Sequence, residues 1–218
     1  MASDVKGDRA GKGGGGGGQA RTRLARRAVI DAARALFLER GYQATTIDAI
    51  SDRADVPAAT VYRLFSSKLG ILKGLLDVSI AGDDQALSVP ERPQVSALFA
   101  EPDPQELLHG FARMTVAINA RSSEVYRILS SASGSDPAAA ALLADYQQRR
   151  DEGQGRIARV LGRAGALRPG LGERGAADIV HALLSPELYR LLVRDRGWSA
   201  ARYEQWLGET LVEQLTSP

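Results

Sequence analysis

Cysteine is absent from the 218-residue sequence, and histidine occurs only twice. Without cysteine, disulfides, cysteine nucleophiles and thiolate metal sites are excluded. His109 and His181 lie far apart, and neither is followed by a metal-ligating residue three or four positions later. No clustered histidines or paired carboxylates suggest a catalytic set. We therefore expect no metal site, no cofactor and no catalytic residues.

Long apolar runs are also missing. None approaches the roughly 20 residues needed to span a bilayer. The N-terminal segment has no apolar core after its charges, as a secretory signal would. We expect a cytoplasmic protein without a membrane partner. Its 44% content of hydrophobic residues is ample for a core.

The net charge of +2 is unevenly distributed. Residues 21–80 carry ten Lys and Arg against six Asp and Glu, whereas residues 81–218 carry fifteen against eighteen. A basic front part and a mildly acidic rear part indicate that only the front faces a polyanion.

The pattern along the chain predicts an all-α protein of about nine helices. A Gly-rich tail over 1–20 should be disordered, because glycine has the most backbone entropy to lose. Residues 21–80 read as a three-helix DNA-binding domain with a helix-turn-helix. A linker rich in Asp, Pro and Ser covers about 81–103. It opens a helical rear domain over 81–218.

The rear domain has apolar positions at helical spacing. They predict helices over roughly 104–120, 122–133, 137–165, 173–194 and 199–216. Pro186 interrupts the fourth of these, because it cannot donate to the Ala182 carbonyl. We expect the helix to kink or restart there, with Ser185 as a local cap.

The front domain has local signals for two short helices joined by a tight turn. Thr46 is placed to cap the first helix. Asp55 stands at the turn position that is usually left-handed, and Asp tolerates this conformation better than most residues. Pro57 suits the start of the second helix. Val61 and Phe65, four residues apart, should pack inward. This arrangement is typical of a helix that enters the major groove of DNA.

The remaining residues of the second helix should face outward toward a DNA operator. Thr60 and Tyr62 can donate to phosphate oxygens, and Arg63 can do the same or reach a guanine edge. Ala58 and Ala59 allow close approach to the groove. A basic arm at Arg21, Arg23, Arg26 and Arg27 can lie along the backbone. The complete set of expected DNA-binding residues is Thr45, Thr46, Pro57, Ala58, Ala59, Thr60, Tyr62, Arg63 and Lys68.

These residues resemble the N-terminal domain of the tetracycline-repressor (TetR) family. The similarity lies in 29-VIDAARALF-37, 41-GY-42, 44-ATTI-47, 50-ISDRA-54, 60-TVYRLF-65 and 67-SK-68. It covers about a quarter of the chain. The resemblance implies a dimeric transcriptional regulator, usually a repressor, whose rear domain binds a small molecule that releases DNA. By position it assigns backbone contacts to Thr60, Tyr62 and Lys68. Asp55 and Pro57 depart from the family's usual glycine and serine, which leaves the operator sequence open.

Two sets of rear-domain residues follow from this interpretation. An effector pocket is expected among aromatic, Met and His side chains, namely Phe111, Met114, Ile118, Tyr126, Tyr146 and His181. A homodimer is expected through apolar stripes on the last two predicted helices, namely Leu184, Leu188, Leu191, Tyr203, Trp206, Leu207 and Leu211. The alternative is that these stripes and aromatic residues belong to the core of one chain.

Two other functions compete with a ligand-released repressor. A non-specific DNA-coating protein would need a larger positive charge than +2. An enzyme built in the helical rear domain would need a catalytic set, which the sequence lacks.

Overall fold

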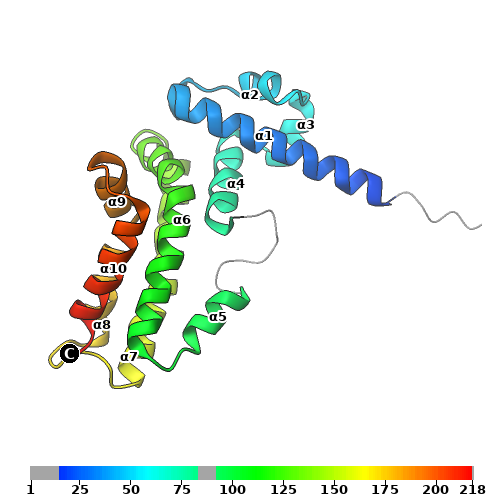
Figure 1. Ribbon diagram of the computed structural model, residues 1–218. Coiled ribbons are helices and arrows are strands. Elements are labelled where there is room, and N and C mark those ends of the chain that lie inside the picture. Colours follow the sequence, from blue (N-terminus) through cyan, green and yellow to red (C-terminus); the bar gives the residue numbers. More distant parts are fainter. Residues whose placement is uncertain (1–14, 83–91, 218) are drawn as a thin grey trace, which may run out of the picture.

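The computed structural model describes residues 15–82 and 92–217. Regular structure in these ranges is helical, apart from one isolated β-bridge between Leu167 and Thr216. The all-α prediction is confirmed. Figure 1 shows α1 lying across one end of the molecule beside α2 and α3, with α4 descending toward a bundle of long helices. None of the described helices combines the length and the hydropathy that a membrane crossing requires.

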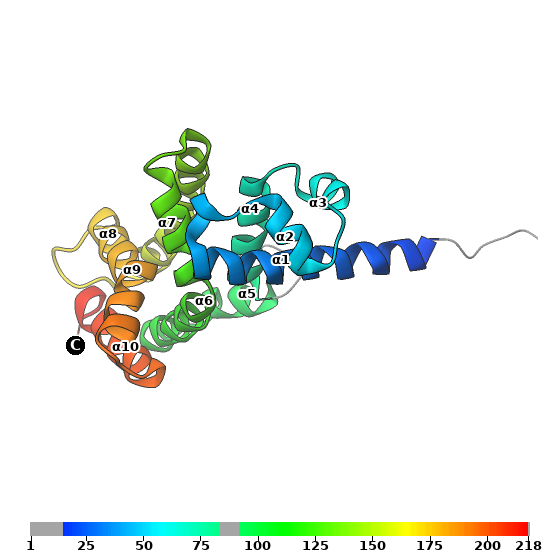
Figure 2. The same cartoon turned by 90° about the horizontal axis from the view of Figure 1, so that it is seen from above.

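Four helices form the front of the molecule. They are α1 (Gly15–Ala44), α2 (Ile47–Ala54), α3 (Ala58–Phe65) and α4 (Lys68–Ala81). Gly41 interrupts α1 with a φ of 79° and a ψ of 167°, a conformation that glycine adopts without strain. Seen from above, the N-terminal part of α1 projects beyond the body of the molecule (Figure 2).

The start of α1 corrects the predicted tail. Gly15 to Ala20 were expected to be disordered but are helical, and the Thr22 hydroxyl donates to the Gly18 carbonyl at 2.9 Å. Once a helix exists, each added residue gains a hydrogen bond without a new nucleation cost, so even glycines can extend it. Residues 1–14 lie outside the described residues.

The rear bundle is built from the remaining helices. They are α5 (Pro93–Phe99), α6 (Pro104–Ser133), α7 (Pro137–Arg163), α8 (Glu173–Leu183), α9 (Pro186–Tyr189), the π-helix η2 (Arg190–Asp195) and α10 (Ala200–Leu215). Two predictions were wrong here. The linker contains α5, which starts at Pro93 and buries Val95, and 104–133 is one helix because nothing breaks it at Arg121. The part of the linker at 83–91 lies outside the described residues.

The expected break at Pro186 is confirmed. Helix α8 ends at Leu183, and α9 starts at Pro186, where the Ser185 hydroxyl accepts a hydrogen bond from the Leu188 backbone N–H at 3.1 Å. The Asn119 side chain of α6 lies within 3.4 Å of the Ser185 carbonyl and 3.5 Å of the Leu184 carbonyl. The Leu184 carbonyl, which loses the Leu188 N–H at the break, therefore gains a donor from a neighbouring helix.

The apolar core continues from the front helices into the bundle. One cluster of buried residues joins α1–α4 to the second half of α6 and the first half of α7, including Val125, Leu129 and Tyr146. A second cluster joins the first half of α6 to α7, α8 and α10. The two ends of α6 thus belong to different cores, so the position of α4 is tied to the packing of α6 and α7.

Polar contacts strengthen this junction. The Arg121 guanidinium of α6 donates to the carbonyls of Ser79 and Ile80 at 3.2 and 3.3 Å, at the C-terminus of α4. A cation at this end is favourable for the helix dipole. The Tyr146 hydroxyl of α7 donates to the Asp77 carboxylate of α4.

Candidate DNA interface and ligand cavity

Helices α2 and α3 are joined by the predicted tight turn. The Thr46 hydroxyl caps α2 by accepting from the Ala49 N–H at 3.1 Å, and Asp55 is left-handed with a φ of 52°. The Ser51 hydroxyl donates to the Val56 carbonyl at 2.7 Å, and Val56 itself is buried. These local contacts fix the angle at which α3 leaves α2.

Helix α3 has one buried and one exposed face. Val61 is fully buried and Phe65 retains 7% of its exposure, and both pack in the core that contains Ile50. Tyr62 is 51% exposed, and Arg63 is exposed beside it. The helix therefore presents a phenol and a guanidinium to solvent from a rigid base.

Most of the predicted DNA-binding residues are accessible on this side. Thr46, Pro57, Ala59, Tyr62 and Arg63 are exposed, while Ala58 and Thr60 are half-buried.

Thr45 is a correction to that set. Its side chain is fully buried, and its hydroxyl lies 2.8 Å from the Gly41 carbonyl and 3.3 Å from the Leu36 carbonyl. Because this hydroxyl closes the end of α1, the Thr45 side chain is not available to DNA.

Lys68 makes several contacts within the chain. Its ammonium donates to the carbonyls of Tyr42 at 2.8 Å and Thr45 at 2.9 Å, lies 3.4 Å from that of Gln43, and lies 4.4 Å from the Tyr42 ring centroid. Burial lowers the pKa of Lys68. In this structure Lys68 ties the start of α4 to the end of α1, and its phosphate contact stays a prediction.

One residue of the basic arm also braces α3. The Arg26 guanidinium lies over the Phe65 ring at 4.6 Å and reaches the Leu64 carbonyl at 3.5 Å. Gly74 of α4 allows this approach, since a Cβ there would lie 3.1 Å from Phe65 and 3.4 Å from Arg26. The C-terminus of α3 is thus held by both α1 and α4.

A cavity of about 910 Å³ lies between α1, α4, α5, α6 and α7 and reaches the α8–α9 break. Five of the six residues expected to bind a ligand line it, namely Phe111, Met114, Ile118, Tyr126 and Tyr146. Its size is that of a typical small-molecule site. It touches α4 at Asp77 and the α8–α9 break at Leu184 and Pro186.

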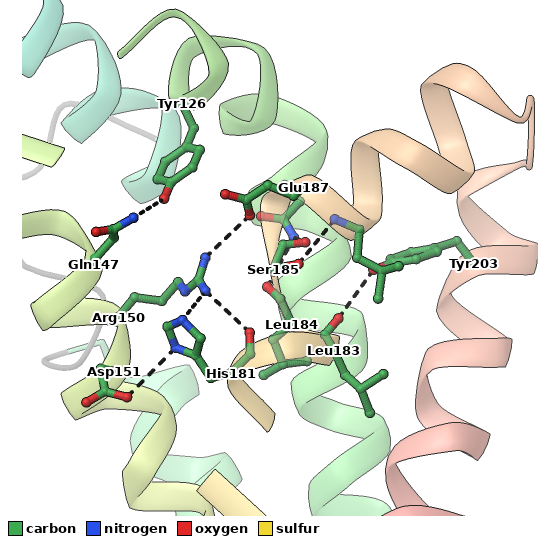
Figure 3. A network of polar contacts seen from close by, with 12 residues as sticks. Tyr126, Gln147, Arg150, Asp151, His181, Leu183, Leu184, Ser185, Glu187 and Tyr203 are labelled. Carbon is green, nitrogen blue, oxygen red and sulfur yellow. Dashed lines mark hydrogen bonds and ion pairs between the residues drawn. The ribbon is translucent and has the colours of Figure 1, made fainter. Parts of the chain in front are cut away.

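His181, the sixth expected ligand residue, does not line the cavity but contacts a residue that does. Arg150 Nη2 lies 2.6 Å from His181 Nε2 and 3.3 Å from the His181 carbonyl (Figure 3). Since a guanidinium only donates, Nε2 is the acceptor and the ring proton is on Nδ1. Burial and the Arg150 charge lower the pKa of His181, which keeps the imidazole neutral. The prediction is corrected: His181 orients Arg150.

The predicted dimer residues divide into two groups. Leu184, Tyr203, Leu207 and Leu211 are buried. These four side chains pack in the chain's own core, the alternative left open by the sequence, and the dimer contact stays a prediction. The other three remain accessible: Leu191 is 49% exposed, and Leu188 and Trp206 are half-buried.

Several residues at these sites gave no signal in the sequence. Asp77, Asn119, Arg121 and Arg150 are ordinary polar positions on helices, and their roles come from contacts with distant segments. The spacing of four between Lys73 and Asp77, which form an ion pair at 2.7 Å, indicated only a helix surface.

Comparison with known proteins agrees with this geometry. The family model described as bacterial regulatory proteins, tetR family, matches residues 29–75. The uncharacterized HTH-type transcriptional regulator YdeS of Bacillus subtilis is 26% identical over 178 residues, which cover 81% of this chain and 82% of YdeS.

Two solved structures share the fold. NalD, the secondary repressor of the MexAB-OprM multidrug efflux pump in Pseudomonas aeruginosa, is 22% identical with a TM-score of 0.69. That alignment covers 90% of this chain and 98% of NalD. A protein from Saccharomonospora viridis in complex with choline is 20% identical with a TM-score of 0.65, covering 90% and 100% of the two chains.

Proposed function

The chain belongs to the TetR family of bacterial regulatory proteins, and we propose that this DNA-binding transcriptional regulator is a dimeric repressor that a small molecule releases from a near-palindromic operator. Members of the family are transcriptional regulators and not enzymes, so the alternative of a helical-domain enzyme falls away.

The observation that carries the proposal is the exposed face of α3. Tyr62 and Arg63 project from a helix whose opposite face, at Val61 and Phe65, is buried. The DNA-binding set that we propose is Thr46, Pro57, Ala58, Ala59, Thr60, Tyr62 and Arg63. Two copies related by a two-fold axis would present two such helices about one DNA turn apart, roughly 34 Å.

The position of the cavity supports release by an effector. It is lined by α4, which leads directly from α3, and by the α6 and α7 residues that hold α4 in place. An effector that fits the cavity in only one position of α4 would shift the population toward a dimer with the wrong spacing for DNA.

Selection of bound sequences from a random duplex pool tests the proposal. The full chain should enrich one near-palindromic sequence and bind it at least ~1,000-fold more tightly than random DNA at physiological salt. Equal affinity for both duplexes, falling in parallel as salt rises, would instead identify a non-specific DNA-binding protein.

Removing the Tyr62 phenol is expected to weaken DNA binding without changing specificity. In Tyr62→Phe the lost phosphate donor should lower affinity for operator and random duplex alike, by roughly 5- to 10-fold. Arg63→Ala serves as the comparison, because loss of a base contact lowers operator affinity more than random affinity. Fluorescence anisotropy with both duplexes measures the two ratios. A Tyr62→Phe protein with unchanged affinities would remove Tyr62 from the interface.

A charge at Leu191 is expected to shift the dimer toward monomer. Leu191 is exposed, and Leu188, three residues before it, is half-buried, so in Leu191→Glu a dimer through this surface would have to bury a carboxylate. We expect the dissociation constant to rise at least ~100-fold by sedimentation equilibrium. Leu38→Glu is the matched control, since Leu38 is 42% exposed on α1. Equal dissociation constants for both variants would place the dimer interface elsewhere.

A further inference from the structure

We propose that the effector is an amphipathic organic anion, with an apolar body and one carboxylate that binds Arg150. This inference rests on the proposed function, because it assumes that the 910 Å³ cavity holds the effector. It adds the chemical class of the ligand and the residue that recognises it.

The cavity wall accommodates an apolar body. Aromatic, Met and aliphatic side chains from α5, α6, α7 and the end of α8 line it, namely Phe99, Phe111, Met114, Ile118, Ile157 and Leu184. Of these, Phe111, Ile157 and Leu184 are nearly fully buried, so the wall is part of the folded core. Covering such a wall with ligand carbon removes apolar surface from water on both sides.

The charged residues of the cavity favour an anion. Seven Lys and Arg side chains line it, against two carboxylates, Asp77 and Glu152. Asp77 is already occupied, because it accepts from the Tyr146 hydroxyl and pairs with Lys73 at 2.7 Å. Among the cations, Arg27 and Arg149 are likewise paired, with Asp31 and Asp145, so the excess rests on the other arginines. The excess of positive charge at a concave, partly apolar surface concentrates anions and repels cations.

Arg150 is the group suited to bind the carboxylate. Only 20% of its side chain is exposed, and its Nη2 donates to His181. Its Nε and Nη1 are buried without a hydrogen-bond acceptor, and Glu187 lies beyond hydrogen-bond distance, 3.8 Å from Nη1. Buried donors without acceptors are costly, and a ligand carboxylate would supply the missing acceptors through charge-assisted bonds.

The neighbours of Arg150 hold it at the cavity. His181 anchors the guanidinium from α8, and Glu187 of α9 lies on its other side (Figure 3). The neutral imidazole accepts a hydrogen bond from Arg150, so the guanidinium keeps its proton and its charge, which is only partly offset by Glu187 at 3.8 Å. Arg150 therefore keeps its attraction for an anion while its position is fixed by helices on both sides of the α8–α9 break.

Three probes of equal chain length and different head charge test the proposal: octanoate, 1-octanol and octyltrimethylammonium. Isothermal titration calorimetry on the full chain measures each affinity. Octanoate should bind the tightest of the three. Arg150→Gln should lower the affinity for octanoate roughly 10- to 100-fold, while the affinity for 1-octanol should change by less than about 3-fold. Arg159→Gln is the matched control, because Arg159 is exposed on the same helix outside the cavity lining. Circular dichroism checks that the variants fold.

Four outcomes overturn the inference, and three of them concern probes that bind. They are equal binding of the three probes, tighter binding of octyltrimethylammonium, and octanoate affinity that is insensitive to Arg150→Gln. Binding of no probe also contradicts it. Operator affinity is measured on the same protein, with and without each probe, and tests the proposed function separately from the class of ligand. If a neutral or cationic probe binds and lowers operator affinity, effector release stands and only the anion assignment fails; loss of sequence-specific DNA binding would instead reject the proposed function.

Discussion

Gly70→Ala is expected to abolish specific operator binding while the rear bundle stays folded. A Cβ at Gly70 would lie 2.0 Å from the Phe65 carbonyl oxygen and 3.1 Å from the Phe65 carbonyl carbon. Both are backbone atoms, so no rotamer change relieves the clash, and the turn between α3 and α4 must open. That turn is already tight, because the Phe65 oxygen accepts from the Ser67 N–H at 2.7 Å and Ser66 has a φ of 64°.

The expected cost is roughly 1–3 kcal/mol of stability, as for other overpacked sites. The larger effect is on DNA, because opening the turn moves Tyr62 and Arg63 away from their positions in the groove. Anisotropy should show at least ~100-fold weaker operator binding, since base contacts and phosphate contacts are lost together. Gly153→Ala is the matched control: nothing lies within 4 Å of its added Cβ, and in the middle of α7 alanine should stabilise by up to about 1 kcal/mol. Operator affinity in Gly70→Ala equal to that of the unchanged protein would contradict the argument.

Lys68→Met is expected to destabilise the front helices by roughly 2–4 kcal/mol, because charge-assisted hydrogen bonds and a cation–π contact are lost together. The methionine fills similar space but leaves the carbonyls of Tyr42 and Thr45 without their donor. Urea unfolding followed by circular dichroism measures the change.

Lys73→Met is the control for Lys68→Met. Lys73 lies on the same helix and makes only the half-exposed ion pair with Asp77, so its loss should cost less than about 1 kcal/mol. DNA binding gives a second comparison. If Lys68 is structural, the salt dependence of binding stays unchanged, whereas loss of a phosphate contact would reduce the slope by about one. Equal unfolding midpoints for the two variants, with a reduced slope in Lys68→Met, would restore Lys68 to the DNA surface.

Features governed by local physics were predictable from the sequence. The Thr46 cap, the left-handed Asp55 and the restart at Pro186 each depend on residues within one helical turn. The inward positions of Val61 and Phe65 follow from their spacing of four on a short helix. These signals were sufficient for the fold and for the exposed face of α3.

Roles set by distant contacts were not predictable. Lys68 is the example on the DNA side, because its motif position indicates a phosphate contact while its partners lie 23 to 26 residues away. In the cavity, the sequence predicted that His181 binds the effector and gave no such role to Arg150. Only the packing of α7 against α8 places the imidazole on the guanidinium. In the dimer prediction, the spacing on α10 identified an apolar face but not whether α6 or a second copy covers it.

The support of α3 from outside its own sequence has an evolutionary consequence. Its orientation depends on Arg26, Gly70 and Gly74, whereas its exposed face contributes little to the core. Ala59 and Arg63 can therefore be exchanged at small cost in stability. Under the proposed function, operator preference is therefore free to drift or to be redesigned while the scaffold is inherited unchanged.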